Sequence, residues 1–172
     1  GDGYGDLAVS APDATAAGGR PGAVFLYWGG ADGLQPSRVL RVDGFGGGFA
    51  QSLAGGTDLN ADGYADLVVG APLAPAMGSV EAGEAYLLLG KVRDGGASSL
   101  VPLRREGDAT TVRGYVGASV GLATLADGAA VALVGAPGLR EDSGEVRVYT
   151  YRSGILEQID RRPRPLPGVR AA

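Results

Sequence analysis

The residues best suited to chemistry lie in an aspartate-rich stretch of nine residues, 58–66. Oxygen-bearing side chains stand at its first, third, fifth and ninth positions: Asp58, Asn60, Asp62 and Asp66. Ca²⁺ takes about six to eight oxygen ligands in a flexible shell. Alternate positions of a tightly curled loop point inward, Gly63 permits a sharp turn, and the backbone carbonyl of Tyr64 offers a further oxygen. The pattern therefore predicts a Ca²⁺ site in this stretch, which we call the aspartate loop.

Two other interpretations of the loop explain less of the pattern. An EF-hand needs a bidentate Glu at its twelfth position, where this sequence has Val69, and it needs flanking helices. A simple Asp-Gly turn would account for Asp62 and Gly63, but not for the other three polar residues. Without a cation, three carboxylates in one loop would repel each other. Mg²⁺ fits less well than Ca²⁺, because it demands stricter octahedral geometry.

The loop has two partial copies. The first covers the last five positions, of which it keeps all but the eighth, and it predicts a partial second metal site formed by Asp2, Tyr4 and Asp6. Its first and third positions would lie before residue 1. The third copy, residues 123–131, has Ala123 and Leu125 where the complete loop has Asp58 and Asn60, and Val131 where it has Asp66. We expect no metal in the third copy.

Composition excludes several functions. The 172 residues contain no cysteine and no histidine, which removes disulfides, thiolate metal sites and the commonest general base. The net charge of −4 disfavours a nucleic-acid partner, and no apolar run reaches the ~20 residues of a membrane-spanning helix. The remaining carboxylates near variable turns are expected to be solvated charges: Glu81, Glu84, Glu141 and Glu145. The sequence thus predicts a protein that is not an enzyme.

The loop belongs to a longer repeat. Residues 2–12 reappear as 62–72 and, less closely, as 127–137, and a second element recurs at 22–27, 83–88 and 144–149. Segments 49–53 and 116–120 precede the second and third copies. These pieces are short, rich in β-branched and aromatic residues, and separated by Gly, Pro, Asp and Asn, as strands and turns are. Repeating units of four antiparallel strands predict an all-β protein built from β-propeller blades.

The apolar runs refine this interpretation, and one alternative fold has to be weighed against it. The apolar runs 67–69 and 133–134 do not alternate with polar residues, which predicts sheets with both faces buried. A sandwich of unrelated hairpins is the alternative, but a sandwich does not require its strands to repeat.

The repeats divide the chain into four parts. We predict a partial blade of three strands at 1–43, a full blade with the calcium loop at 44–106, and a full blade with a degenerate loop at 107–162. Residues 163–172 are a linker or the start of another blade. Because an unclosed propeller exposes strand edges and apolar faces, a homo-oligomer that completes the ring is expected.

Taken together, these features resemble the FG-GAP repeat, the blade of integrin α-subunit propellers and their bacterial relatives. Residues 49–53 carry the "FG" part, residues 70–72 carry the "GAP" part, and the aspartate loop lies between them. This sequence departs from the family pattern at Ser10, Ala50 and Val116. The resemblance implies a seven-bladed propeller with cations in the turn between the first two strands of a blade.

The resemblance also implies a setting and a role. The protein is expected to be extracellular or secreted, at a cell surface, and to act in adhesion by binding a protein or glycan. Usage rich in Ala, Gly and Arg, with Lys91 as the single lysine, favours a bacterial source. Recognition is expected in the variable connections 13–21, 73–82 and 138–143. The alternatives are the propeller domain of a secreted lyase or hydrolase, and a purely structural repeat.

Overall fold

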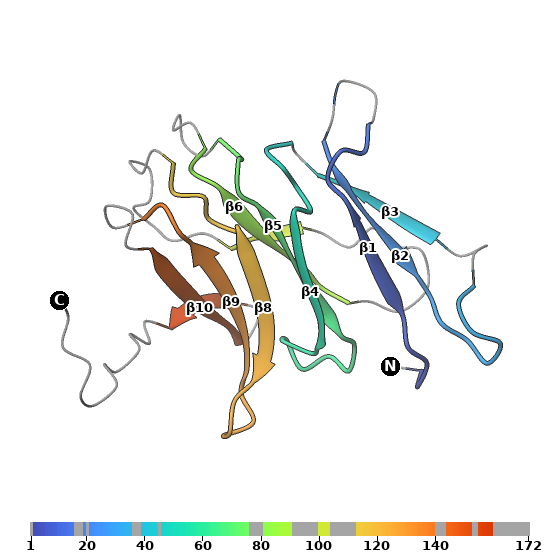
Figure 1. The fold of residues 1–172 in the computed structure, drawn as a ribbon. Coiled ribbons are helices and arrows are strands. Elements are labelled where there is room, and N and C mark those ends of the chain that lie inside the picture. Colours follow the sequence, from blue (N-terminus) through green and yellow to red (C-terminus); the bar gives the residue numbers. More distant parts are fainter. Residues whose placement is uncertain are drawn as a thin grey trace, which may run out of the picture.

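The computed structural model describes residues 2–15, 19, 21–35, 39–44, 46–75, 81–90, 100–103, 113–139, 144–152 and 155–159. Within these ranges the chain forms eleven β-strands in three antiparallel sheets and no helix (Figure 1). Accordingly, this part of the chain contains no helix that could cross a membrane. The predicted all-β architecture of four-stranded antiparallel blades is confirmed. Residues 163–172 lie outside the described ranges, and the unit boundaries predicted above stay a proposal.

Each sheet is a meander whose strands follow one another in chain order. The first sheet contains β1 (Leu7–Ala11), β2 (Ala23–Tyr27) and β3 (Val39–Asp43). The second contains β4 (Ser52–Thr57), β5 (Asp66–Ala71), β6 (Glu84–Leu88) and β7 (Leu100–Pro102). The third contains β8 (Ser119–Thr124), β9 (Ala130–Ala136), β10 (Glu145–Arg152) and β11 (Ile155–Ile159). Figure 1 shows the sheets side by side in the order of the sequence.

The second sheet is buried on both faces. Every residue of β5 is buried, and successive side chains point to opposite faces, as in any strand. Leu67 and Val69 pack with Val24 of the first sheet. Val68 instead joins a cluster with Val134 of the third sheet. The apolar run 67–69 therefore serves two interfaces, and the prediction of a doubly buried sheet is confirmed.

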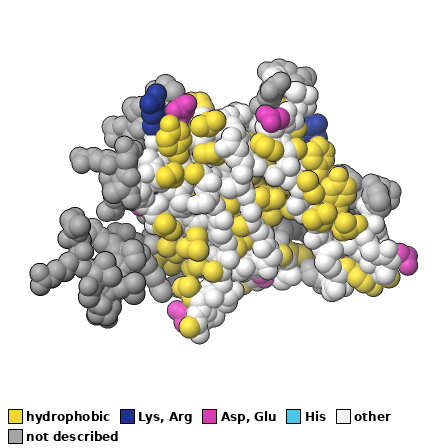
Figure 2. Space-filling view, in the orientation of Figure 1, with side chains coloured by type: hydrophobic (Ala, Val, Ile, Leu, Met, Phe, Trp, Pro, Cys, Tyr) yellow, Lys and Arg dark blue, Asp and Glu magenta, His cyan; other side chains and the backbone are white. Residues whose placement is uncertain are grey.

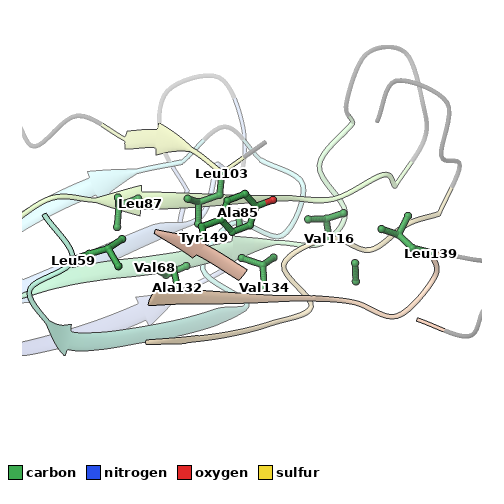
Figure 3. Packing of buried hydrophobic residues seen from close by; sticks show 11 residues of the cluster. Leu59, Val68, Ala85, Leu87, Leu103, Val116, Ala132, Val134, Leu139 and Tyr149 are labelled. Carbon is green, nitrogen blue, oxygen red and sulfur yellow. The ribbon is translucent and has the colours of Figure 1, made fainter. Parts of the chain in front are cut away.

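The interface between the second and third sheets is a continuous apolar layer. Figure 3 shows Val68 and Leu87 of the second sheet packed against Ala132, Val134 and Tyr149 of the third. Each of these side chains is at most 1% exposed. Burial of these apolar side chains favours the association of the neighbouring blades.

The segments that precede β4 and β8 differ from the prediction. Residues 49–53 and 116–120 were expected to be strands, but β4 begins at Ser52 and β8 at Ser119. Phe49 lies in a turn, where its N–H donates to the carbonyl of Gly46 (3.2 Å), and Ala50 has a φ of 69°. Phe49 therefore marks a residue buried between sheets and not a residue of a strand.

These preceding segments join neighbouring sheets through backbone hydrogen bonds. At the first joint, the N–H of Gly44 donates to Gly22 (3.0 Å) and the N–H of Leu73 donates to Gly47 (2.8 Å). A Cβ on Gly22 would lie 2.5 Å from the carbonyl oxygen of Phe49, so only glycine permits this approach.

The second joint repeats this arrangement. The N–H of Val116 donates to Ala82 (3.0 Å), and a Cβ on Gly83 would lie 2.2 Å from the nitrogen of Val116. The Ser52 hydroxyl adds a hydrogen bond to the carbonyl of Gly117 (2.8 Å). Glycine at the same repeat position therefore allows close contact at both joints.

The buried ring of Phe49 should be a major source of stability. It is fully buried and meets the ring of Tyr86 edge to face, with 5.7 Å between centroids. We expect Phe49→Ala to lower the free energy of unfolding by about 3–5 kcal/mol, measured by chemical denaturation. Leu34→Ala, at a side chain that is 46% exposed, should cost less than about 0.5 kcal/mol. Equal effects of the two substitutions would contradict the packing described for the first joint.

Candidate metal centre

The aspartate loop connects β4 to β5 and curls through two residues with left-handed backbone. Ala61 has a φ of 60° and Gly63 a φ of 88°. Gly63 therefore makes the sharp turn that its type and position predict. Ala61 adopts a conformation that costs an L-residue free energy, which means that the rest of the loop holds it there.

Side chains from the start of the loop point into its interior. The backbone N–H of Asp62 donates both to Asp58 Oδ1 (3.1 Å) and to Asn60 Oδ1 (3.1 Å). Because two side-chain oxygens approach the same amide, they must lie close together. Asp58 Oδ2 also accepts from the N–H of Gly63 (2.7 Å). The side chains at the first and third loop positions thus lie close together.

Asp62 lies beside them, on the exposed side of the loop. Its Oδ2 accepts from the Asn60 amide (2.8 Å), and its Oδ1 accepts from the N–H of Tyr64 (2.9 Å). The side chains of Asp58, Asn60 and Asp62 therefore surround one turn.

Asp66 occupies a different environment at the first residue of β5. It is only 2% exposed. Its Oδ2 accepts from the N–H of Leu59 (2.7 Å) and its Oδ1 from the N–H of Gly90 (2.8 Å). Burial raises the pKa of the Asp66 carboxyl above its usual value, and the two backbone hydrogen bonds oppose this rise. The negative charges of Asp62 and Asp58 raise the pKa further, so the three carboxylates interact electrostatically.

The donor chemistry of the loop suits a hard divalent cation, because every candidate ligand is an oxygen. A carboxylate has about four lone-pair sites, so an oxygen that accepts one N–H can still bind a metal. In the described residues, however, no three side chains among His, Cys, Asp and Glu are gathered in a metal-binding arrangement. The Asp66 carboxylate is directed to backbone amides on both sides, while Asp58 and Asp62 surround the turn. The residues fit the ion in type and sequence order.

The partial copies preserve the Asp-Gly turn. Asp2 Oδ1 accepts from the N–H of Tyr4 (3.1 Å), and Asp127 Oδ1 accepts from the N–H of Ala129 (3.1 Å). Both contacts match the one between Asp62 and Tyr64, so this hydrogen bond belongs to the turn in all three units. Asp6 Oδ1 accepts from the N–H of Gly29 (2.8 Å), which matches the contact between Asp66 and Gly90. The sequence analysis did not predict these contacts of Gly29 and Gly90, although the two glycines stand at the same position of the repeat.

The glutamates are not simply solvated charges. Glu84 is 6% exposed and accepts a hydrogen bond from the hydroxyl of Tyr86. Glu145 forms an ion pair with Arg147 (3.2 Å), whose side chain is 3% exposed. That expectation was wrong, because a pair two residues apart on a strand shares one face and can be buried together.

Glu81 also has partners. It accepts from the hydroxyl of Tyr115 (3.2 Å) and lies 3.6 Å from Arg113 Nε at the second joint between sheets. Glu141 lies outside the described residues. Of these four glutamates, the three that lie in the described residues all have structural contacts.

Comparison with known proteins supports the resemblance. Residues 49–88 match the model of the FG-GAP repeat. A stretch of 73 residues is 41% identical to integrin alpha-IIb of Mus musculus, covering 41% of this chain and 7% of that protein. A stretch of 84 residues is 40% identical to integrin alpha-PS5 of Drosophila melanogaster, covering 44% of this chain and 8% of the relative. Integrin alpha-4 of Xenopus laevis is 40% identical over 75 residues. The chain thus spans less than a tenth of the length of the relatives it matches.

The left-handed turn at Gly63 yields a stability test. Gly63→Ala should lower the free energy of unfolding by about 1–2 kcal/mol, because a Cβ is strained at a φ of 88°. Gly5→Ala is the matched control, since Gly5 lacks a positive φ, has no atom within 4 Å of an added Cβ, and corresponds to Ala65 in the second unit. It should change stability by less than about 0.5 kcal/mol in the same thermal or chemical denaturation. A loss at Gly5 as large as that at Gly63 would show that the turn is not the cause.

Proposed function

We propose, on the premise that residues 49–88 form an FG-GAP repeat and that the chain is integrin-α-like there, that this protein is a calcium-stabilised β-propeller module. Its role is to bind an extracellular protein or glycan ligand in adhesion. The observation that carries the proposal is the aspartate loop, which lies between the two motifs of that repeat and gathers oxygen ligands around one turn.

The proposed Ca²⁺ ligands are the side chains of Asp58, Asn60, Asp62 and Asp66 and the carbonyl of Tyr64. The convergence of Asp58 and Asn60 on one amide supports the first part of this set. The mutual electrostatic effect of the three carboxylates supports the rest, because a cation would relieve their repulsion. Asp2, Tyr4 and Asp6 form a partial second site by the same pattern. The third loop, with Val131 in place of Asp66, is proposed to bind no metal.

The ion supplies positive charge to a turn that is otherwise crowded with negative charge. Extracellular calcium modules have dissociation constants of about 0.1–1 mM. At ~1 mM Ca²⁺, a ~0.1 mM site adds about 1.4 kcal/mol to stability. We therefore propose that calcium stabilises the connection between β4 and β5 rather than acting as a switch.

Ligand binding is assigned to the opposite end of the sheets. The aspartate loop precedes β5, whereas the connection 73–82 follows it, so the two lie at opposite ends of that strand. The connections 13–21 and 138–143 follow β1 and β9 in the same way. Parts of all three connections lie outside the described residues. Loops that differ between units on a repeated scaffold are where recognition usually sits.

A binding role is favoured over catalysis by what the carboxylates do. Glu84 and Glu145 are held by Tyr86 and Arg147, and the aspartates belong to the proposed cation site. We propose a non-enzymatic protein of a cell surface or secreted fraction, with a bacterial source. A secreted lyase or hydrolase, and a purely structural repeat, are the alternatives. Binding to a glycan or matrix-protein array that is lost in chelator would separate the proposed role from the structural one.

Calcium affinity tests the site directly. Isothermal titration of the chelator-treated chain should give a dissociation constant of about 0.1–1 mM. Asp58→Asn combined with Asp62→Asn should weaken binding at least about tenfold, because two of the proposed anionic ligands are lost. Asp127→Asn, in the third loop, is the matched control and should leave the affinity unchanged. Identical titration heats for the wild type and the double variant would show that the aspartate loop is not the calcium site.

Among the described residues, two sheet faces expose apolar side chains, and we propose that two copies of the chain associate through them. In the first sheet, Leu7 and Val9 are 43% and 41% exposed on β1 and stand opposite the half-buried Tyr27 and Phe25 of β2. Figure 2 shows hydrophobic side chains gathered over this part of the molecule. The same repeat positions in the second sheet include Leu67 and Val69, which are buried against the first sheet.

The complementary face belongs to the third sheet. Val146 is 64% exposed there, and the residue at its repeat position in the second sheet, Ala85, is fully buried against the third. A second copy can therefore place its third sheet on the first sheet of its neighbour. We propose this head-to-tail contact as the basis of a homo-oligomer that extends or closes the propeller.

The oligomer is tested by light scattering coupled to size exclusion. At tens of micromolar the wild-type chain should have a mass above that of the monomer. Leu7→Asp with Val9→Asp should return it to the monomer mass, since charges on an apolar face oppose its burial. Leu34→Asp, at an exposed side chain in the connection between β2 and β3, should leave the oligomer intact. A wild-type chain that elutes as a stable monomer would exclude this association.

A further inference from the structure

One contact of the aspartate loop reaches well beyond the loop. Asp66 Oδ1 accepts from the N–H of Gly90 at 2.8 Å, and these residues are 24 positions apart. In the first unit, Asp6 Oδ1 accepts from the N–H of Gly29 at 2.8 Å, over 23 positions. Gly29 stands seven positions after Gly22, which precedes β2, and Gly90 stands seven positions after Gly83, which precedes β6. A contact repeated at matching positions is a property of the unit.

The glycine allows the backbones to approach closely. A Cβ on Gly90 would lie 2.4 Å from the carbonyl oxygen of Ala65, the residue before Asp66. A Cβ on Gly29 would lie 2.1 Å from the carbonyl oxygen of Gly5, the residue before Asp6. Neither carbonyl oxygen could move without shifting the backbone of the loop. The N–H donor is therefore held against the carboxylate by a contact that any larger residue would break.

The third unit lacks both partners. Val131 stands where the other units have Asp66 and Asp6, and Tyr151 stands where they have Gly90 and Gly29. There the strand β10 runs on through Tyr151, which pairs with Leu156 of β11. β10 has eight residues, whereas β2 and β6, which stand at the same position of the repeat, have five each.

The difference in strand length has a physical reason. Where the aspartate is present, its carboxylate accepts the N–H of the glycine, so this N–H is not used in a strand ladder. Val131, which replaces the aspartate in the third unit, offers no side-chain acceptor. There the chain continues as β10 and pairs with β11.

We propose that Asp66 and Asp6 are positioning residues. Asp66 ends β6 and fastens the aspartate loop to the chain that follows β6, and Asp6 ends β2 and fastens the corresponding partial loop to the chain that follows β2. Asp66 thus holds two backbone segments with one buried carboxylate, through Leu59 in the loop and Gly90 beyond β6. Any ligand that orders the loop also orders Gly90. For Ca²⁺ as that ligand, this last step rests on the proposed function.

Amide hydrogen exchange of the ¹⁵N-labelled full chain, followed by NMR, tests the contact without reference to calcium. In chelator, the Gly90 amide should exchange at least about tenfold faster in Asp66→Val than in the wild type, while the Gly29 amide keeps its rate. Asp58→Asn, which alters the loop but not this contact, should leave Gly90 protected. A Gly90 amide whose exchange is unchanged in Asp66→Val would overturn the proposal.

A second variant covers the case in which Asp66→Val does not fold. Asp6 is exposed, so Asp6→Val should be tolerated, and in that variant the Gly29 amide should exchange faster while Gly90 is unchanged. Unchanged exchange of Gly29 would count against the proposal as directly as the first result.

A separate experiment tests whether calcium binding orders Gly90. Addition of ~1 mM Ca²⁺ should slow exchange of the Gly90 amide about two- to elevenfold in the wild type, as a dissociation constant of about 0.1–1 mM requires, and by a smaller factor in Asp58→Asn. If calcium binds by titration but Gly90 does not respond, the coupling is refuted while the calcium site stands. If calcium does not bind at all, the proposed function fails, and the measurements in chelator still decide whether Asp66 fastens the strand.

Discussion

The rest of the structure depends on one constraint, which is the burial of the Asp66 carboxylate where the aspartate loop enters β5. Asp66 begins β5, whose side chains fill the interfaces on both faces of the second sheet, so it cannot move outward without disturbing that packing. Burial disfavours its charge, and the charges of Asp58 and Asp62 add to the cost. Two backbone amides offset part of this cost, and a divalent cation held by the same loop would offset more. The metal proposal is thus a consequence of where the sheet places its carboxylates.

The blade architecture explains why such a loop can exist. Sheets stacked face to face provide a rigid frame, and the joints between them are made by short segments with buried residues such as Phe49. Glycines at equivalent places, Gly22 and Gly83, allow backbones to meet closely at both joints. Loops at the ends of so fixed a frame can hold strained conformations, such as that of Ala61. Within residues 49–88, which match the FG-GAP repeat, the joint, the charged turn and the buried strand therefore have separate physical tasks.

The repeated pattern of residues 2–12 and 62–72 was sufficient to predict the sheets, and the polar spacing of residues 58–66 was sufficient to predict how the loop curls. Other features depend on contacts that local sequence does not encode. The run 49–53 has strand-like residues, but Phe49 is buried from a turn, since burial in a joint favours aromatic residues as strongly as a strand does. Glu84 was expected to be solvated and is buried, because its partner Tyr86 lies on the same strand face. The partnership of Asp66 with Gly90 joins residues 24 positions apart, and only comparison of the repeats with one another could have suggested it.

A crystal structure of the chain grown in millimolar CaCl₂, with anomalous data collected at long wavelength, would test the central claim most directly. A calcium peak is expected inside the loop between β4 and β5, within bonding distance of oxygens from Asp58, Asn60 and Asp62, and no peak is expected in the third loop beside Asp127. An ordered aspartate loop without anomalous density, or density of equal height in the third loop, would contradict the claim that the spacing of these carboxylates selects a cation.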